Sequence, residues 1–291
     1  MEHVLWQDRP QLRRPVLVAA FEGWNDAADA ASTAARYLAE RWGGRPFATI
    51  DPEEFYDFSA TRPQVHLADG ITREIVWPEN EFMAASLPGS QRDAVVFIGV
   101  EPQLRWRTFC ASITGVAREL GVEMVITLGA LLADVAHTRP VRVTGTAADP
   151  ALVQRLGLER SRYEGPTGIV GVLHDACNRA QIESASLWAA VPHYVAATPS
   201  PKATLALVER TTALLASPLT TTDLEIAAAS YERQISEVVD ADEDVRDYVE
   251  RLERERDDED TAPEPLDESS LPSGDALAAE VERFLREQRG D

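Results

Sequence analysis

The sequence is poor in cysteine, and this limits how the chain can be held together. Only Cys110 and Cys177 occur in 291 residues, and neither belongs to a CxxC pair. A disulfide framework needs an even set of cysteines, and a zinc knuckle needs closely spaced pairs. We therefore expect two reduced thiols and a fold that depends on its hydrophobic core.

Long hydrophobic runs are also missing. No apolar segment approaches the ~18 residues that mark a membrane-spanning helix, and the mean hydropathy is −0.23. The first residues, Met1 to Asp8, lack the basic start and apolar stretch of a signal peptide. These absences predict a cytoplasmic protein without a membrane partner.

Positive charge is scarce: 28 lysines and arginines face 49 aspartates and glutamates, for a net charge of −21. Residues 240–291 hold 20 acidic and 7 basic residues, so this end alone carries −13. A negative field repels nucleic acid and anionic membranes. We expect neither as a partner.

The common catalytic and nucleotide-binding motifs are absent. The sequence has no GxxxxGK[ST] phosphate loop, no GxGxxG after its first strand, no GxSxG elbow and no HExxH pair among its five histidines. We therefore assign no catalytic residues, no metal ligands and no cofactor from motifs.

What is present is an alternation of short apolar runs with helical segments. Apolar strands are predicted at 16–21, 93–100, 122–131, 141–147 and 185–195, and helices at 27–41, 103–120, 167–179 and 201–215. Strands alternating with helices predict an α/β fold with a mostly parallel central sheet and helices on both faces. Two further strands, 64–67 and 71–77, flank Ala68-Asp69-Gly70, which predicts a hairpin forming an antiparallel edge.

The chain changes character after Pro218. We divide it into an α/β domain (1–218), a helical extension (219–258), an acidic proline-rich linker (259–272) and a terminal amphipathic helix (273–291). The extension has a heptad-like apolar seam: Leu224, Ala228, Tyr231, Ile235, Val238, Val245, Val249 and Leu252. This spacing predicts a long helix or helical hairpin that buries the seam against the body or another subunit.

Two turns are candidates for a functional cleft or interface. Gly23, Trp24, Asn25 and Asp26 lie between the first strand and its helix. A helix N-terminus attracts anions, but the acidic side chains at this turn would repel phosphate. A capped helix with Trp24 at an interface is the favoured interpretation. The second turn contains Gly165, Thr167 and Gly168; an amide nest is possible there, and a purely structural turn is favoured.

Further candidates follow the other strands, because α/β sheets bind ligands at the carboxyl ends of their strands. Glu101, Arg105 and Trp106 follow the strand at 93–100, and an Arg-Trp pair fits either an interface hot spot or local stacking. Gly129, His137, Arg139 and His193 complete the set. For the histidines, structural or interface hydrogen bonding is the default and catalysis the alternative.

These turns resemble those of the proteasome assembly chaperone 2 (PAC2) family. The segments that carry the resemblance are Phe21–Ala28, Gly99–Trp106, Thr127–Ala130, Arg139–Gly145, Tyr163–Gly171, Leu187–Tyr194 and Pro199–Ala203. Their order and spacing, over about residues 16–215, are more specific than any one of them. The chain is most similar to the bacterial branch with a helical C-terminal extension.

The resemblance implies a nucleoside-phosphorylase-like body and a homo-oligomer, for which a trimer is our guess. Eukaryotic members chaperone the assembly of proteasome α-rings, so proteasome subunits or another protein client are the expected partners. The family implies no catalytic residues to transfer. Its loose ATP-grasp or carboxylate–amine ligase label finds no supporting residues in this sequence.

The leading hypothesis is therefore a non-catalytic, homo-oligomeric chaperone or scaffold. The alternative is an enzyme or nucleotide-like small-molecule binder with a cleft near Gly23, Gly129, His137 and Gly165. A third hypothesis makes the acidic end of the chain a docking arm for a basic partner, with binding that weakens as salt rises.

Overall fold

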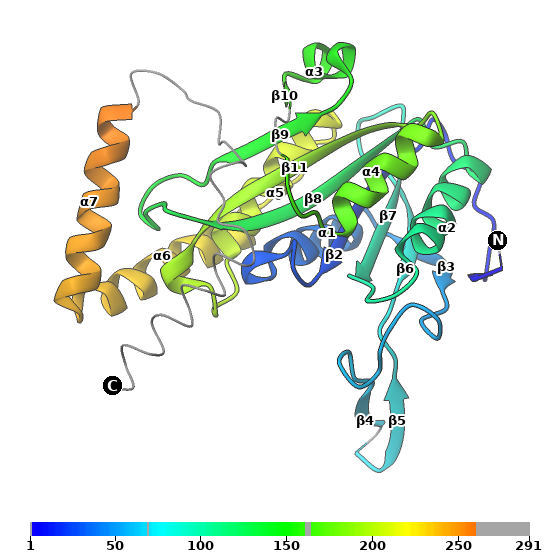
Figure 1. Cartoon of the computed structure of the whole chain (residues 1–291), viewed down its shortest axis with the longest axis horizontal. Coiled ribbons are helices and arrows are strands. Elements are labelled where there is room, and N and C mark those ends of the chain that lie inside the picture. Colours follow the sequence, from blue (N-terminus) through cyan, green and yellow to red (C-terminus); the bar gives the residue numbers. More distant parts are fainter. Residues whose placement is uncertain (1, 69, 161–163, 260–291) are drawn as a thin grey trace.

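The protein is described from a computed structural model, covering residues 2–68, 70–160 and 164–259. Within these residues, nine strands form one sheet in the order β1-β3-β6-β7-β2-β8-β11-β9-β10 (Figure 1). The bounds are β1 Val4–Trp6, β2 Val16–Glu22, β3 Arg45–Ile50, β6 Glu81–Ser86, β7 Asp93–Val100, β8 Met124–Ala133, β9 Val143–Ala147, β10 Glu159–Arg160 and β11 Glu183–Pro192.

Parallel pairing occupies the middle of this sheet. Strands β7, β2, β8 and β11 are mutually parallel, whereas β6, β3 and β1 on one side and β9 on the other are added antiparallel. The parallel strands are the continuous apolar runs of the sequence, as expected for strands covered on both faces. The predicted α/β class is confirmed.

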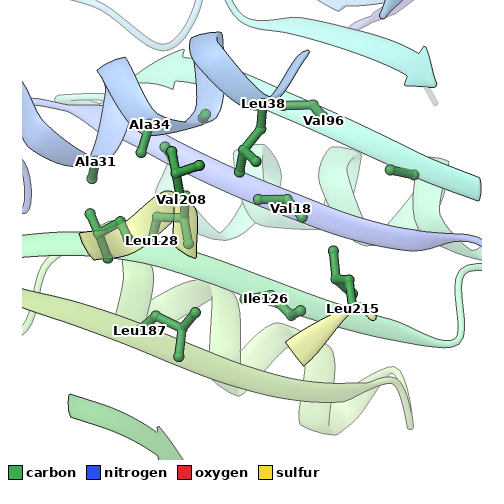
Figure 2. Packing of buried hydrophobic residues seen from close by; sticks show 14 of the residues in the cluster. Val18, Ala31, Ala34, Leu38, Val96, Ile126, Leu128, Leu187, Val208 and Leu215 are labelled. Atoms are coloured by element: carbon green, nitrogen blue, oxygen red, sulfur yellow. The ribbon is translucent and has the colours of Figure 1, made fainter. Parts of the chain in front are cut away.

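Helices cover the two faces of the sheet. The short turn η1 (Ala27–Asp29), α1 (Ala30–Arg41) and α5 (Pro201–Leu214) lie on one face, and α2 (Trp106–Glu119) and α4 (Ile169–Arg179) on the other; α3 (Pro150–Leu156) precedes β10. Successive residues of β2 alternate between the two cores: Val18 packs with the first, Leu17 with the second. Figure 2 shows the first core, with Leu38 of α1 and Val208 of α5 over the sheet.

The hairpin was placed wrongly by the sequence analysis. Strands β4 (Gln64–Ala68) and β5 (Thr72–Val76) pair with each other in a separate two-stranded sheet and project from the body (Figure 1). The antiparallel edge comes instead from β1, β3 and β6. The turn chemistry at 68–70 predicts a hairpin but carries no information about which sheet the hairpin joins.

The C-terminal extension is a pair of helices, α6 (Thr222–Asp240) and α7 (Glu243–Glu259). Their apolar side chains, among them Ile235 and Val249, form a third buried cluster with Ala136 of the body. One seam position was wrong: Val238 is 67% exposed and Val239 is buried at 4%. The fourth residue after Ile235 stays on its face of a helix with 3.6 residues per turn. Residues 260–291, which hold most of the predicted linker and the terminal helix, lie outside the described part.

No helix in the described part of the chain is both long enough and apolar enough to cross a membrane.

Candidate functional site

The turn after β2 is built around Asp26. Its Oδ1 accepts the backbone N–H groups of Ala31 (2.6 Å) and Ser32 (3.1 Å), so the carboxylate caps the first turn of α1. The backbone between Asp26 and α1 has an unfavourable conformation: Ala28 and Asp29 both have a φ of 53°, in the left-handed region. The hydrogen bonds to Asp26 stabilise this turn. Burial raises the pKa of Asp26, these hydrogen bonds lower it, and the charge of Asp29 raises it further.

Glu101 joins the two candidate turns. It follows β7, and its Oε1 accepts from Asn25 Nδ2 (3.2 Å) and from the backbone N–H of Ile169 (2.8 Å), the first residue of α4. Gly168 leaves room for this contact, since a Cβ there would lie 2.4 Å from Asn25 Nδ2 and 2.8 Å from Glu101 Oε1. Gly23 is similarly close, with its Cβ position 3.3 Å from that of Glu101. The structure thus brings Gly23, Asn25, Glu101 and Gly168 together.

The cluster of Gly23, Asn25, Glu101 and Gly168 lies at a switch point of the sheet. The chain leaves β2 for α1 on one face of the sheet and leaves β7 for α2 on the other. Such a switch point is where open α/β sheets usually bind ligands, and the N-terminus of a helix such as α4 attracts an anion. Here the carboxylate of Glu101 takes the position of that anion.

The remaining candidates at these strand ends have local roles or face outward. Trp24 is 65% exposed, and Thr167 is exposed at the turn before α4, as is Gly165. The ring of Trp188 covers Gly129, whose Cβ would lie 2.5 Å from it.

Arg105 and Trp106, predicted as an interface hot spot or a local stack, each bond to a different neighbour. The Arg105 guanidinium forms an ion pair with Glu54, and the Trp106 indole N–H donates to the carbonyl of Pro102. Arg105 starts α2 with a left-handed φ of 52°. Both side chains therefore bond to nearby residues, and Arg105 is exposed.

His137 lies elsewhere, beneath the C-terminal helices. It is buried at 3% exposure. Its backbone N–H donates to the Tyr194 hydroxyl (2.8 Å), while its ring nitrogens lie 2.9 Å from that hydroxyl and 3.0 Å from Ser236 Oγ on α6. Lys202 donates to the His137 carbonyl and forms an ion pair with Glu232 of α6. Burial, helped by the positive charge of Lys202, lowers the pKa of His137 and favours its neutral form.

His193 belongs to the same layer. Its Nδ1 lies 3.1 Å from Asp134 Oδ1, which also accepts from the Tyr248 hydroxyl of α7 at 2.9 Å. The His193 and Tyr248 rings meet edge to face at 5.4 Å. These side chains attach α7 to the body, a role that Tyr194 and Tyr248 share and that the sequence analysis missed.

Arg139 lines a cavity of about 10 Å³ beside His137, Lys202 and Tyr231. That volume holds about one water molecule. His137 packs against α6 and so lies apart from the other residues of the predicted cleft. The end of β8 does lie beside the turn at Gly23, because the Ala130 N–H donates to the Asn25 carbonyl at 2.9 Å. The sequence could not show that α6 docks over His137.

A larger groove was not anticipated. It measures about 580 Å³ and runs between α1, the base of the β4–β5 hairpin and the β6–β7 part of the sheet. Glu81 and Met83 of β6 and Trp77 beside the hairpin line it. Across the described residues, no group of three or more histidine, cysteine, aspartate or glutamate side chains is placed to hold a metal ion.

Comparison with protein families matches residues 20–239 to the PAC2 family. Among solved structures, a PAC2 family protein from Streptomyces avermitilis is 46% identical with a TM-score of 0.74, covering 81% of this chain and 99% of that one. A Mycobacterium tuberculosis proteasome-assembly chaperone homologue is 48% identical with a TM-score of 0.74, covering 80% and 99%.

An archaeal proteasome activator from Pyrococcus furiosus is 18% identical with a TM-score of 0.65, covering 81% of this chain and 97% of that one, and shares the fold. No curated protein matches the chain significantly.

Proposed function

Since the chain belongs to the PAC2 family, we propose that it is a non-catalytic interaction protein with a chaperone-like role, acting on a protein client as a homo-oligomer. A trimer is the assembly we expect. Proteasome subunits are the first clients to test, because a structural relative with 48% identity is a proteasome-assembly chaperone homologue.

The observation that carries this proposal is the position of Glu101. The switch point of the sheet, where a phosphate-bearing substrate would be expected, holds an internal carboxylate bonded to Asn25 and to the start of α4. A phosphate would have to displace a charge of its own sign. His137, for which catalysis was the alternative interpretation, is bonded to Tyr194 and Ser236 beneath α6.

Exposed apolar side chains support contact with other proteins. Trp24 (65% exposed), Leu104 (49%) and Leu132 (42%) follow or end three neighbouring strands at the carboxyl edge of the sheet. The projecting β4–β5 hairpin adds Val65, Leu67 and Ile75, each nearly 60% exposed. Large exposed apolar groups that gather in this way mark interaction surfaces.

The test is made on the purified full chain. Light scattering is expected to give a multiple of the 32.0 kDa chain mass, and millimolar phosphate, ATP or nucleosides are expected to leave the melting temperature unchanged. A monomer that a nucleotide stabilises would overturn the proposal and support a small-molecule binder at the strand ends.

A further inference from the structure

The 580 Å³ groove beside α1 exists because the helices leave part of one sheet face open. Helix α1 packs over β2 and β7, while β6 lies farther out in the strand order. Glu81 and Met83 of β6 are half-buried and form part of the groove lining. The hairpin base, Val76 and Trp77, forms another wall.

The groove carries uncompensated negative charge. Glu22, Glu40, Glu79 and Glu81 line it, against Arg36 and Arg62. Arg36 already forms an ion pair with Glu22. Within the described chain, neither Glu79 nor Glu81 has an ion pair with a lysine or arginine. Burial, and then the like charge of Glu79, raise the pKa of Glu81. A cation from outside the chain would relieve this repulsion.

The walls suit a cation carried on an aliphatic stem. Met83, Ile98 and Val76 are apolar lining residues. The Trp77 ring is 45% exposed and is held edge-on by Phe58 at 4.8 Å. Lysine and arginine side chains lay their methylenes on apolar surface and place their cations over indole rings.

The groove is larger than one basic side chain needs. Val76 and Gln64 end the hairpin at the groove, and because successive residues of a strand point to opposite faces, the next pair on that face is His66 and Glu74. A free diamine would fill only part of a groove of about 580 Å³, whereas a polypeptide segment could also cover the apolar lining residues Met83 and Ile98. An isolated two-stranded hairpin is marginally stable in water, so a packing partner would also stabilise it.

We propose that this groove binds a segment of a partner polypeptide that carries lysine or arginine beside apolar residues, with the basic side chain held between Glu79, Glu81 and Trp77. The inference rests on the proposed function, because it names the chemistry of one client segment. The groove reaches the ends of β2 and β7 at Glu22 and Val100, but Trp24 is not among its lining residues.

The probe is a fluorescein-labelled octapeptide of alternating arginine and valine, titrated with the full chain by fluorescence anisotropy at about 0.1 M salt. Glu79→Gln/Glu81→Gln is expected to weaken binding at least tenfold. The control Glu243→Gln/Glu250→Gln removes the same charge from exposed positions of α7 and is expected to leave the dissociation constant within twofold.

Equal weakening by both double variants would overturn the proposal, because it would show that binding depends only on the overall charge of the chain. An octapeptide of arginine and glycine that binds as tightly as the valine peptide would also overturn it, in favour of a small polyamine. If the peptide fails while protein capture from lysate persists, this inference falls and the proposed function stands.

Discussion

At the scale of single residues, Glu101 determines which ligands the carboxyl ends of the strands can accept. It joins the turn after β2 to the start of α4 through Asn25 and the Ile169 N–H. Asn25 and Glu101 were candidates because they follow predicted strands, and Gly168 because it belongs to a glycine-containing turn. The sequence does not show that one carboxylate connects them, since 68 positions separate Glu101 from Ile169.

Glu101→Ala is expected to destabilise the protein by about 1–3 kcal/mol, because it leaves buried donors unpaired. Denaturant unfolding measures the loss. Glu54→Ala is the matched control, since that carboxylate is exposed and forms an ion pair with exposed Arg105; it is expected to cost less than about 0.5 kcal/mol. Equal costs for the two variants would contradict the role given to Glu101.

The buried imidazole of His137 makes the free energy of unfolding depend on pH. Its folded-state pKa lies below the unfolded value of 6.5 because of burial and Lys202. The contribution of neutral His137 to the free energy of unfolding is therefore fully present above pH 6.5. It is lost as the pH falls from 6.5 toward the folded-state pKa, because in that range only the unfolded chain takes up the proton. Burial lowers the pKa of His174, which lies 3.0 Å from Thr127 Oγ1, to about 4, so His174 acts in the same direction.

The measurement is the free energy of unfolding at pH 7.5 and pH 5.5 for the wild type and for His137→Gln. The wild type should be less stable at pH 5.5, and the variant should lose part of that difference while His174 keeps the rest. An unchanged pH difference in His137→Gln would show that His137 titrates alike in both states.

At the scale of elements, apolar runs predicted the central strands and helical periodicity predicted the extension. Strand β6 was missed because its apolar run, Phe82–Ala85, is only four residues long and includes two alanines, which are depleted in strands. The hairpin was found and misplaced, since alternation and a turn do not specify a partner sheet. The docking of α6 and α7 depends on contacts between residues far apart in the sequence, such as Ser236 with His137 and Tyr248 with Asp134.

Two adjacent valines of α6 test that docking. Val239→Ala removes two methyl groups from the buried cluster and is expected to cost about 2 kcal/mol of unfolding free energy. Val238→Ala makes the same chemical change at a site that is 67% exposed, and it should cost less than about 0.5 kcal/mol. The reverse order would show that the heptad-like register predicted from the sequence holds after all.

At the scale of the whole molecule, the features that suit binding to other proteins lie at its surface. Glu101 occupies the switch point of the sheet, and His137 and His193 contact α6 and α7. Exposed apolar groups remain at the strand ends and on the hairpin. Membership of the PAC2 family accounts for the α/β body, and the proposed client and oligomer would use these exposed surfaces.

The most direct measurement is quantitative affinity capture from native lysate, comparing the wild type with Trp24→Ala/Leu104→Ala and with the control Leu5→Ala/Ile226→Ala, whose side chains are also exposed. The account predicts a protein client recovered at near-stoichiometric levels, tested first for proteasome subunits. Loss of a hot spot at the strand ends should lower that recovery by about tenfold or more, with no change in the control. Recovery of no protein above a tag-only background, from any of the three chains, would contradict the claim that this protein works by binding other proteins.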